Sequence, residues 1–332
     1  MNIAMLGSGA WGTALANLLC ENGHTVTLWT RSAQRAADMA RSRINPRLEG
    51  VPLHPNLQFS SDLSCVQSCQ MTVFATPSYA IRQTAAAVRE LLPKDALLVS
   101  VTKGIESGTG LRITQIIEEE TGLRAAALSG PSHAEEVSRN IPTGCVAACA
   151  DISMAEQIQD VFMNDSFRVY ASGDVVGVEL SAALKNVIAL CAGVCDGLGL
   201  GDNTKALLVT RGLTELARLG IVLGGRQETF AGLAGVGDMI VTCTSMHSRN
   251  RRAGILIGQG VPARQAMEQV GAVVEGYYAA KSAYELSRKV GVEMPISREA
   301  YAVLYEGKAP AETIRTLMRR DKKHEFEDAG WL

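Results

Sequence analysis

The first half of the chain alternates short apolar or β-branched strands with helical segments, and this alternation limits the possible folds more than any other feature. Seven strands are expected, over residues 2–6, 24–29, 71–76, 96–101, 125–130, 143–148 and 167–172. Helical patterns separate most of them, the first over residues 12–23. Alternation of this kind is typical of a parallel, doubly wound sheet.

The pattern changes after about residue 174. Helical patterns rich in Ala, Leu and Val are expected over 174–199, 203–223, 226–235, 249–258, 262–270, 275–291, 296–306 and 310–319. A chain of 332 residues is also too long for one ordinary domain. We therefore expect the α/β class, with a sheet domain over residues 1–174 and an all-α domain over residues 175–332. The charged segment RRDKKHEFED at 319–328 is expected to be a mobile tail.

Composition argues against several classes of protein. The formal net charge of -2 gives no electrostatic basis for binding nucleic acid, and no apolar run approaches the length of a membrane span. The N-terminus MNIAMLGSGAWG lacks a signal peptide, so a cytoplasmic location is expected. The eight cysteines lack zinc-site spacing and the five histidines do not cluster near them, so no metal site is expected.

A glycine-rich turn follows the first strand. Gly7, Gly9 and Gly12 form GSGAWG, which fits G-x-G-x-x-G between a strand and a helix. Gly7 permits the turn, Gly9 lets the backbone approach a pyrophosphate, and Gly12 lets the helix pack on the strand. The helix start, with Ala10 and Trp11, offers N–H groups to phosphates. This predicts a Rossmann-type dinucleotide site; the alternative is a similar turn that binds no dinucleotide.

The end of the second strand bears on which dinucleotide is bound. An NAD-preferring site usually has an acidic residue there, whereas this chain has Arg31 and Ser32. Arg31 would meet a 2′-phosphate and Ser32 is a possible donor. The sequence therefore favours NADPH over NADH; the alternative is an ordinary exposed arginine.

Candidate substrate residues follow several strands and begin one helix. Three segments follow strands at their carboxyl ends, where open α/β sheets bind ligands: ATPS (75–78), TKG (102–104) and SGPS (129–132). Lys103 comes directly off its strand. In the helical half, Ser248, Arg249 and Asn250 at a helix start suit a phosphate. The alternative for them is a capped, solvated helix start.

A lysine lies in the middle of an apolar helix. In VELSAALKNVIALCAGV (178–194), Lys185 is flanked one turn away mostly by small residues. A buried ammonium group is costly unless it is paired or has a lowered pKa. We therefore predict a functional Lys185; the alternative is a lysine whose stem lies along the surface.

Seven segments in order closely resemble the bacterial NAD(P)-dependent glycerol-3-phosphate dehydrogenase family: GSGAWGTALA, VTKGIE, SGPSHAEE, ALKNVIA, GLAGVGDMIVTCTS, SRNRR and VVEGY. The resemblance implies reversible reduction of dihydroxyacetone phosphate at C2 by NADPH, or by NADH. The product is sn-glycerol 3-phosphate for glycerophospholipid synthesis. The resemblance also implies that the protein forms a homodimer.

The resemblance also implies residue roles. Lys185 matches the proton acceptor. Substrate contacts are expected at Lys103, Gly130, Ser132, Lys185, Asp238, Ser248, Arg249 and Asn250. Cofactor contacts are expected at Trp11, Arg31, Lys103, Ala134, Arg249, Val273 and Glu275. Because ketone reduction leaves negative charge on the C2 oxygen, a nearby ammonium can stabilise that charge and donate its proton. Asn186 and Asp238 would orient the lysine and the substrate, and Thr242 would support Asp238.

Two other functions fit part of the pattern. β-Hydroxyacid dehydrogenases also join a Rossmann domain to helices and use a helical lysine and asparagine, but their substrates carry a carboxylate. A non-catalytic NADPH-binding sensor would need none of Lys103, Lys185 and Asp238. Turnover of dihydroxyacetone phosphate distinguishes the dehydrogenase from both.

Overall fold

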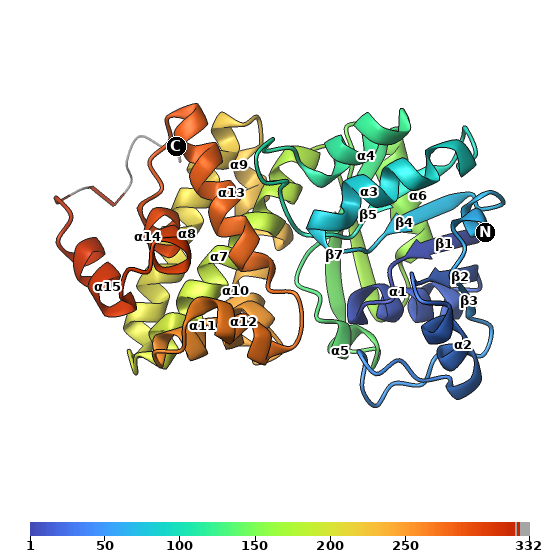
Figure 1. Ribbon diagram of the computed structural model, residues 1–332. Coiled ribbons are helices and arrows are strands. Elements are labelled where there is room, and N and C mark those ends of the chain that lie inside the picture. Colours follow the sequence, from blue (N-terminus) through green and yellow to red (C-terminus); the bar gives the residue numbers. More distant parts are fainter. Residues whose placement is uncertain (323, 326–332) are drawn as a thin grey trace.

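The computed structural model describes residues 1–322, 324 and 325, which form a sheet domain followed by a helical domain (Figure 1). The sheet has the strand order β3-β2-β1-β4-β5-β6-β7-β8. Its strands are β1 (Asn2–Leu6), β2 (Thr25–Trp29), β3 (Gln58–Ser60), β4 (Met71–Phe74), β5 (Leu97–Ser100), β6 (Ala125–Ser129), β7 (Thr143–Ala148) and β8 (Phe167–Ser172). The order reverses at β1, which pairs in parallel with β2 on one side and β4 on the other. Ligands of open α/β sheets bind outside the carboxyl ends of strands at such a point.

Strand β1 shows why this half of the chain folds into layers. Successive side chains of a strand point to opposite faces. Ile3 and Met5 pack in one apolar cluster with α1 (Ala10–Glu21) and α6 (Ile152–Phe162). Ala4 and Leu6 pack in a second cluster with α3 (Ile81–Val88) and α4 (Ile113–Thr121). The sheet is therefore covered by helices on both faces.

Two features of the sheet differ from the sequence-based expectation. Strand β3, with the sequence QFS, was not expected, because three residues show no alternation. Strand β7 runs antiparallel to β6, so the sheet is not wholly parallel. A parallel return needs a crossover of a dozen or more residues, usually a full helix. The connection over residues 130–142 is long enough, but it contains only α5 (Ala134–Val137), a single turn, and no full crossover helix; β7 returns in the opposite direction.

The helical domain is built around α7 (Val175–Gly197), against which helices α8 to α11, α13 and α14 pack. The other helices are α8 (Asp202–Val222), α9 (Gln227–Ala231), α10 (Asp238–Thr244), α11 (Arg249–Gly258), α12 (Ala263–Val270), α13 (Glu275–Val290), α14 (Pro295–Tyr305) and α15 (Pro310–Met318). The expected helix at 226–235 is divided into α9 and a π-helical turn, η4 (Leu233–Gly237), and α10 was not expected. By length and composition α7 resembles a membrane span, but 83% of its apolar window is buried inside the protein.

Helices α7 and α11 cross with their backbones in contact. A Cβ atom at Gly193 would lie 2.0 Å from the carbonyl oxygen of Arg251, and one at Gly254 would lie 2.0 Å from that of Leu190. Any side chain at these glycines would separate the helices. The crossing therefore holds α7 and α11 together as one rigid pair.

The described part of the charged C-terminal segment contacts the helical domain. Arg320 Nη2 lies 2.8 Å from Glu293 Oε1, and the carbonyl oxygen of Glu325 accepts a hydrogen bond from Arg211. Residues 323 and 326–328, over which the expected tail also extends, lie outside the described residues.

Candidate active site

Two lysines from different domains share one buried carboxylate. Lys185 Nζ, on α7, donates to Oδ1 of Asp238 at 2.5 Å. Lys103 Nζ, just after β5, donates to Oδ2 of the same carboxylate at 2.7 Å and to the carbonyl oxygen of Gly130 at 2.9 Å. Lys185 and Asp238 are 4% and 1% exposed, so this arrangement lies in the interior. It brings together three residues that were predicted from separate motifs.

The charges of this group are set by burial and by one another. The pKa of Lys185 is lowered to about 8, chiefly by burial; Asp238 opposes this shift, and the charge of Lys103 adds to it. Burial alone would raise the pKa of Asp238, but the two ammonium groups outweigh it and hold that pKa below its ordinary value. With Asp238 ionised and both lysines protonated, the group carries a net positive charge that suits an anionic substrate oxygen.

Thr242 supports the lysine as well as the aspartate. Its hydroxyl donates to the carbonyl oxygen of Asp238 at 2.6 Å and accepts from Lys185 Nζ at 2.5 Å. Asn186, which was expected to orient the lysine and the substrate, makes no hydrogen bond to Lys185 within the described residues. Its amide donates to the carbonyl oxygen of Ala182, and its Oδ1 accepts from Asn250 Nδ2 at 2.9 Å. Asn186 therefore joins α7 to α11.

At the start of α11, the side chain of Arg249 makes no hydrogen bond or ion pair with the described residues. Ser248 caps the helix by accepting from the backbone N–H of Arg251 at 3.2 Å, and Asn250 binds Asn186. The side chain of Arg251 is held by Asp196 at 2.8 Å and by the carbonyl oxygen of Thr244. Arg249 is exposed, and its charge interacts with those of Glu275 on α13 and Glu135 in the sheet domain. Of the predicted phosphate cradle, Arg249 is thus the side chain best placed to meet a ligand.

The glycine-rich turn provides a cradle for a dinucleotide. Gly7 has φ of 131°, and a Cβ atom there would lie 2.6 Å from the carbonyl oxygen of Ala75, after β4. A Cβ atom at Gly9 would meet open space, and no side chain caps the start of α1. Trp11 Nε1 is buried and has no hydrogen-bond partner among the described residues. Free backbone N–H groups at a helix start suit a pyrophosphate, so these residues fit the group that the turn predicts.

An arginine that the sequence analysis missed lies near this turn. Asn45 donates to the carbonyl oxygen of Ser8 at 3.1 Å and accepts from the backbone N–H of Arg47 at 3.0 Å. Burial lowers the pKa of Arg47, and so do the nearby guanidinium groups of Arg35, Arg249 and Arg31. Arg31 is exposed, whereas the hydroxyl of Ser32 caps α2 (Ala33–Ser42). This cluster of like charges is suited to an anion, and no sequence motif marks Arg47.

The remaining predicted contacts lie on both sides of the cleft. Ala134 packs in an apolar cluster with Trp11. Ser132 Oγ donates to the carbonyl oxygen of Gly130 at 3.0 Å. Val273 is half-buried, and Glu275 begins α13. His133 was not predicted as a site residue. Its Nε2 is buried without a hydrogen-bond partner among the described residues. Burial lowers the pKa of His133, and the positive charges of Lys185 and Lys103 lower it as well.

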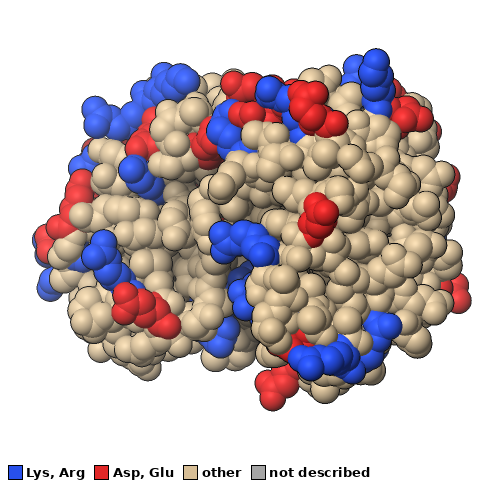
Figure 2. All heavy atoms as spheres, turned by 45° about the vertical axis from the view of Figure 1, so that its right-hand side comes forward, with Lys and Arg blue, Asp and Glu red and all other residues tan. Residues whose placement is uncertain are grey.

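The surface agrees with this placement. Figure 2 shows Lys and Arg side chains gathered in the hollow between the two domains.

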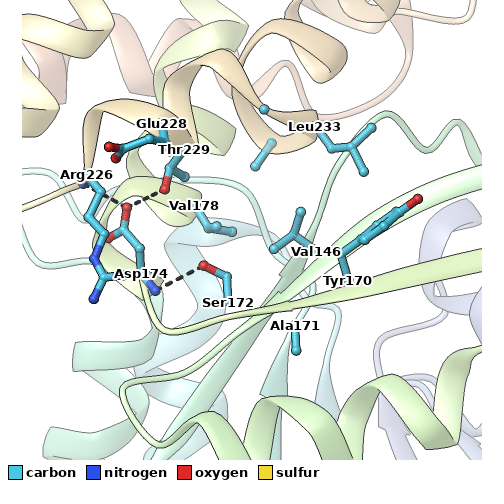
Figure 3. Close-up of a pocket in the computed structure, with 12 residues that line it drawn as sticks. Val146, Tyr170, Ala171, Ser172, Asp174, Val178, Arg226, Glu228, Thr229 and Leu233 are labelled. Atoms are coloured by element: carbon cyan, nitrogen blue, oxygen red, sulfur yellow. Dashed lines mark hydrogen bonds between the residues drawn. The ribbon is translucent and has the colours of Figure 1, made fainter.

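A separate cavity of about 440 Å³ lies beside β8, lined by Tyr170, Arg226 and Glu228 among others (Figure 3). At its edge Asp174 accepts from the backbone N–H of Arg226 and from Thr229 Oγ1. None of the predicted site residues lines this cavity, so it is distinct from the candidate site.

The chain is similar to known proteins over nearly its whole length. Residues 2–155 and 174–315 match the family profiles described as the N-terminus and the C-terminus of NAD-dependent glycerol-3-phosphate dehydrogenase. A protein of a Thermoanaerobacter species, named glycerol-3-phosphate dehydrogenase (NAD(P)+), is 49% identical, with 98% of this chain and 99% of that protein covered. One of the same name from Moorella thermoacetica is also 49% identical, with 99% of each covered. A structure of glycerol-3-phosphate dehydrogenase from Coxiella burnetii has a TM-score of 0.93 at 36% identity, covering 96% of this chain and 99% of that one.

Proposed function

The chain belongs to the NAD-dependent glycerol-3-phosphate dehydrogenase family, and on that premise we propose that it interconverts dihydroxyacetone phosphate and sn-glycerol 3-phosphate. One observation carries the proposal beyond family membership. A buried lysine with a pKa of about 8 shares an aspartate with a second lysine at the cleft between the domains. When bound, NADPH or NADH supplies the hydride that reduces C2.

Lys185 serves as the proton donor in the reducing direction. The C2 oxygen gains negative charge as the carbonyl is reduced, and the ammonium groups of Lys185 and Lys103 stabilise that charge. Lys185 Nζ then gives its proton to the oxygen and becomes neutral. A group with a pKa near the working pH is effective in both directions. In the oxidising direction, neutral Lys185 accepts the proton of the C2 hydroxyl.

Asp238 and Thr242 hold Lys185 in one orientation. Asp238 accepts hydrogen bonds from both lysines and keeps them from separating. Thr242 accepts a second hydrogen bond from Lys185, since the proton of its own hydroxyl is donated to the carbonyl oxygen of Asp238. We assign Lys103, Gly130 and Ser132 to substrate contact from the sheet domain.

Arg249 binds the phosphate of the substrate, with the hydroxyl of Ser248 beside it. A guanidinium group forms paired hydrogen bonds with phosphate oxygens. The cofactor is held by the turn at Gly7, Gly9 and Gly12, with Trp11. Arg31 faces the 2′-phosphate, which favours NADPH. We propose further cofactor contacts at Ala10, in the glycine-rich turn, and at Ser32, after β2. Following the resemblance, we propose others at Lys103, Ala134, Arg249, Val273 and Glu275.

The resemblance supports three further proposals: a homodimer, a cytoplasmic location, and supply of sn-glycerol 3-phosphate to glycerophospholipid synthesis. The decisive assay follows NADPH absorbance after addition of dihydroxyacetone phosphate, and is then repeated with NADH. We expect oxidation of NADPH with this substrate, none with the oxo forms of β-hydroxy acids, and no reduction of NADP+ by β-hydroxy acids. Turnover of the acids alone would indicate a β-hydroxyacid dehydrogenase. Tight NADPH binding without any turnover would indicate a sensor.

A further inference from the structure

Ser78 joins the sheet domain to the start of α13. It lies in the loop after β4, is 7% exposed, and donates twice to the carboxylate of Glu275. The backbone N–H lies 3.2 Å from Oε1, and the hydroxyl Oγ lies 2.6 Å from Oε2. Hydrogen bonds to a charged group are stronger than those between neutral groups. Residues that are 197 positions apart in the chain are thus held together across the two domains.

On the sheet-domain side, Ser78 contacts the loop that carries Lys103. A Cβ atom at Gly104 would lie 2.4 Å from the Cβ of Ser78. The two loops can pack this closely only because residue 104 has no side chain. The position of Ser78 is therefore tied to the residue that follows Lys103.

On the helical side, Glu275 connects to the helix that carries Lys185. The backbone N–H of Gly276, the next residue, donates to Asn250 Oδ1 at 2.8 Å. Asn250 Nδ2 donates in turn to Asn186 Oδ1 at 2.9 Å, and Asn186 follows Lys185 directly. Asn186 and Asn250 are 4% and 8% exposed, so these hydrogen bonds are shielded from water.

We propose that Ser78 is a positioning residue, which through Glu275 and Asn250 fixes Lys103 and Lys185 relative to each other. The proposal rests on the proposed function for its kinetic consequence, but not for its structural one. Tyr79 and Tyr278 strengthen the same junction, since their ring centroids lie 5.9 Å apart across it. A polar contact and an aromatic contact therefore join the same two segments of chain.

The test compares Ser78→Ala with Ser282→Ala. Ser282 is a matched control because its buried hydroxyl, also on α13, donates across the domain junction to the carbonyl oxygen of Ile105 at 3.2 Å. It takes no part in the hydrogen bonds from Ser78 to Asn186. Amide hydrogen exchange is measured for each full-length protein. We expect faster exchange at residues 275–279 and 249–253 in Ser78→Ala than in Ser282→Ala. Equal exchange in the two variants would overturn the proposal.

The kinetic test uses a double-mutant cycle. We expect Ser78→Ala to lower kcat for dihydroxyacetone phosphate by about 10-fold, in the range for loss of a hydrogen bond to a charged group. In a Glu275→Ala background the same change should lower kcat by less than about 2-fold, because the carboxylate that accepts from the Ser78 hydroxyl is already absent. Losses that multiply would contradict the route through Glu275. If Ser78→Ala does not fold, Glu275→Gln, which keeps the shape of the side chain, is compared with Ser282→Ala in the exchange experiment.

The two proposals fail in different ways. Absence of turnover in the wild-type protein would refute the proposed function, and the exchange result would still decide the role of Ser78. Normal turnover in the wild type with identical behaviour of the two serine variants would refute the role of Ser78 alone.

Discussion

Lys185 and Asp238 form an ion pair of 2.5 Å between Nζ and Oδ1, in a site where both side chains are almost completely buried. Each residue changes what the other can do. Asp238 favours the protonated form of Lys185, and Lys185 favours the ionised form of Asp238. With a pKa of about 8, Lys185 is protonated near neutral pH and can still give up its proton within a catalytic cycle.

Replacing Lys185 by Ala should abolish most turnover. Loss of a general acid typically lowers kcat by about 100- to 10,000-fold. NADPH affinity should stay within a few-fold, since the glycine-rich turn lies on the other domain. Steady-state kinetics and a fluorescence titration with NADPH measure the two quantities. Lys281→Ala, a partly exposed lysine on α13, is the control and should behave like the wild type. A Lys185→Ala enzyme with normal kcat would exclude this residue as the donor.

The pH dependence of kcat should follow the ionisation of Lys185. In the oxidising direction the lysine must be neutral, so kcat should rise with pH around 8, where burial places its pKa. In Asp238→Asn the carboxylate that favours the protonated form is lost, and the rising limb should move to lower pH. Asp196→Asn, which removes the partner of Lys205 and Arg251, is expected to leave the limb in place. A limb that moves upward in Asp238→Asn would contradict this assignment.

Arg31→Asp should shift the preference from NADPH toward NADH. The carboxylate repels a 2′-phosphate and can accept a hydrogen bond from a 2′-hydroxyl. The measurement is kcat/KM with each cofactor. Arg41→Asp on the exposed side of α2 changes the charge equally and should leave the ratio of the two values unaltered. An unchanged ratio in Arg31→Asp would indicate that Arg35 or Arg47, and not Arg31, distinguishes NADPH from NADH.

Arg249→Ala should impair use of the phosphorylated substrate more than that of unphosphorylated dihydroxyacetone. Binding energy from the phosphate helps to position C2, so both KM and kcat should suffer for dihydroxyacetone phosphate. NADPH affinity should fall modestly, because Arg249 is also close to Arg47, which lies near the glycine-rich turn. The values of kcat/KM for both substrates decide the matter, with Arg252→Ala as the neighbouring control. Equal proportional losses would show that Arg249 serves the cofactor or the fold.

Stability should depend on pH through Glu215. This side chain of α8 is 3% exposed and accepts from the backbone N–H of Ile296 at 2.7 Å. Burial raises its pKa from 4.5 to about 7. The folded state therefore binds the proton more tightly, and its stabilising effect is present below pH 4.5 and is lost as the pH rises to 7.

The expected loss in the free energy of unfolding is on the order of 3 kcal/mol. Denaturant titrations of the wild type and Glu215→Gln at the two ends of this range measure it. The variant should lose that part of the pH dependence, while Glu156→Gln on the surface should keep it. Identical pH dependence in wild type and Glu215→Gln would show that Glu215 ionises normally.

Local sequence patterns predicted the elements better than the contacts between them. Seven of the eight strands and most helices follow from apolar periodicity, which is a property of neighbouring residues. The direction of β7 goes with a connection that contains no full crossover helix, which strand periodicity does not reveal. The partners of Asn186 and Ser78 lie 64 and 197 positions away, and no periodic pattern encodes such pairs. Lys185, Lys103 and Asp238 were identified because unusual residue types stand out in short segments, but their shared carboxylate was visible only in three dimensions.

The crossing of α7 and α11 has a consequence for substrate choice. Lys185 lies on one of these helices and Arg249 begins the other, and the backbones touch at Gly193 and Gly254. The crossing therefore fixes the distance between the backbone positions of Lys185 and Arg249. Under the proposed roles, this distance sets how far the phosphate bound by Arg249 lies from the oxygen that meets Lys185. We therefore expect a substrate with one more carbon between these two groups to be used poorly.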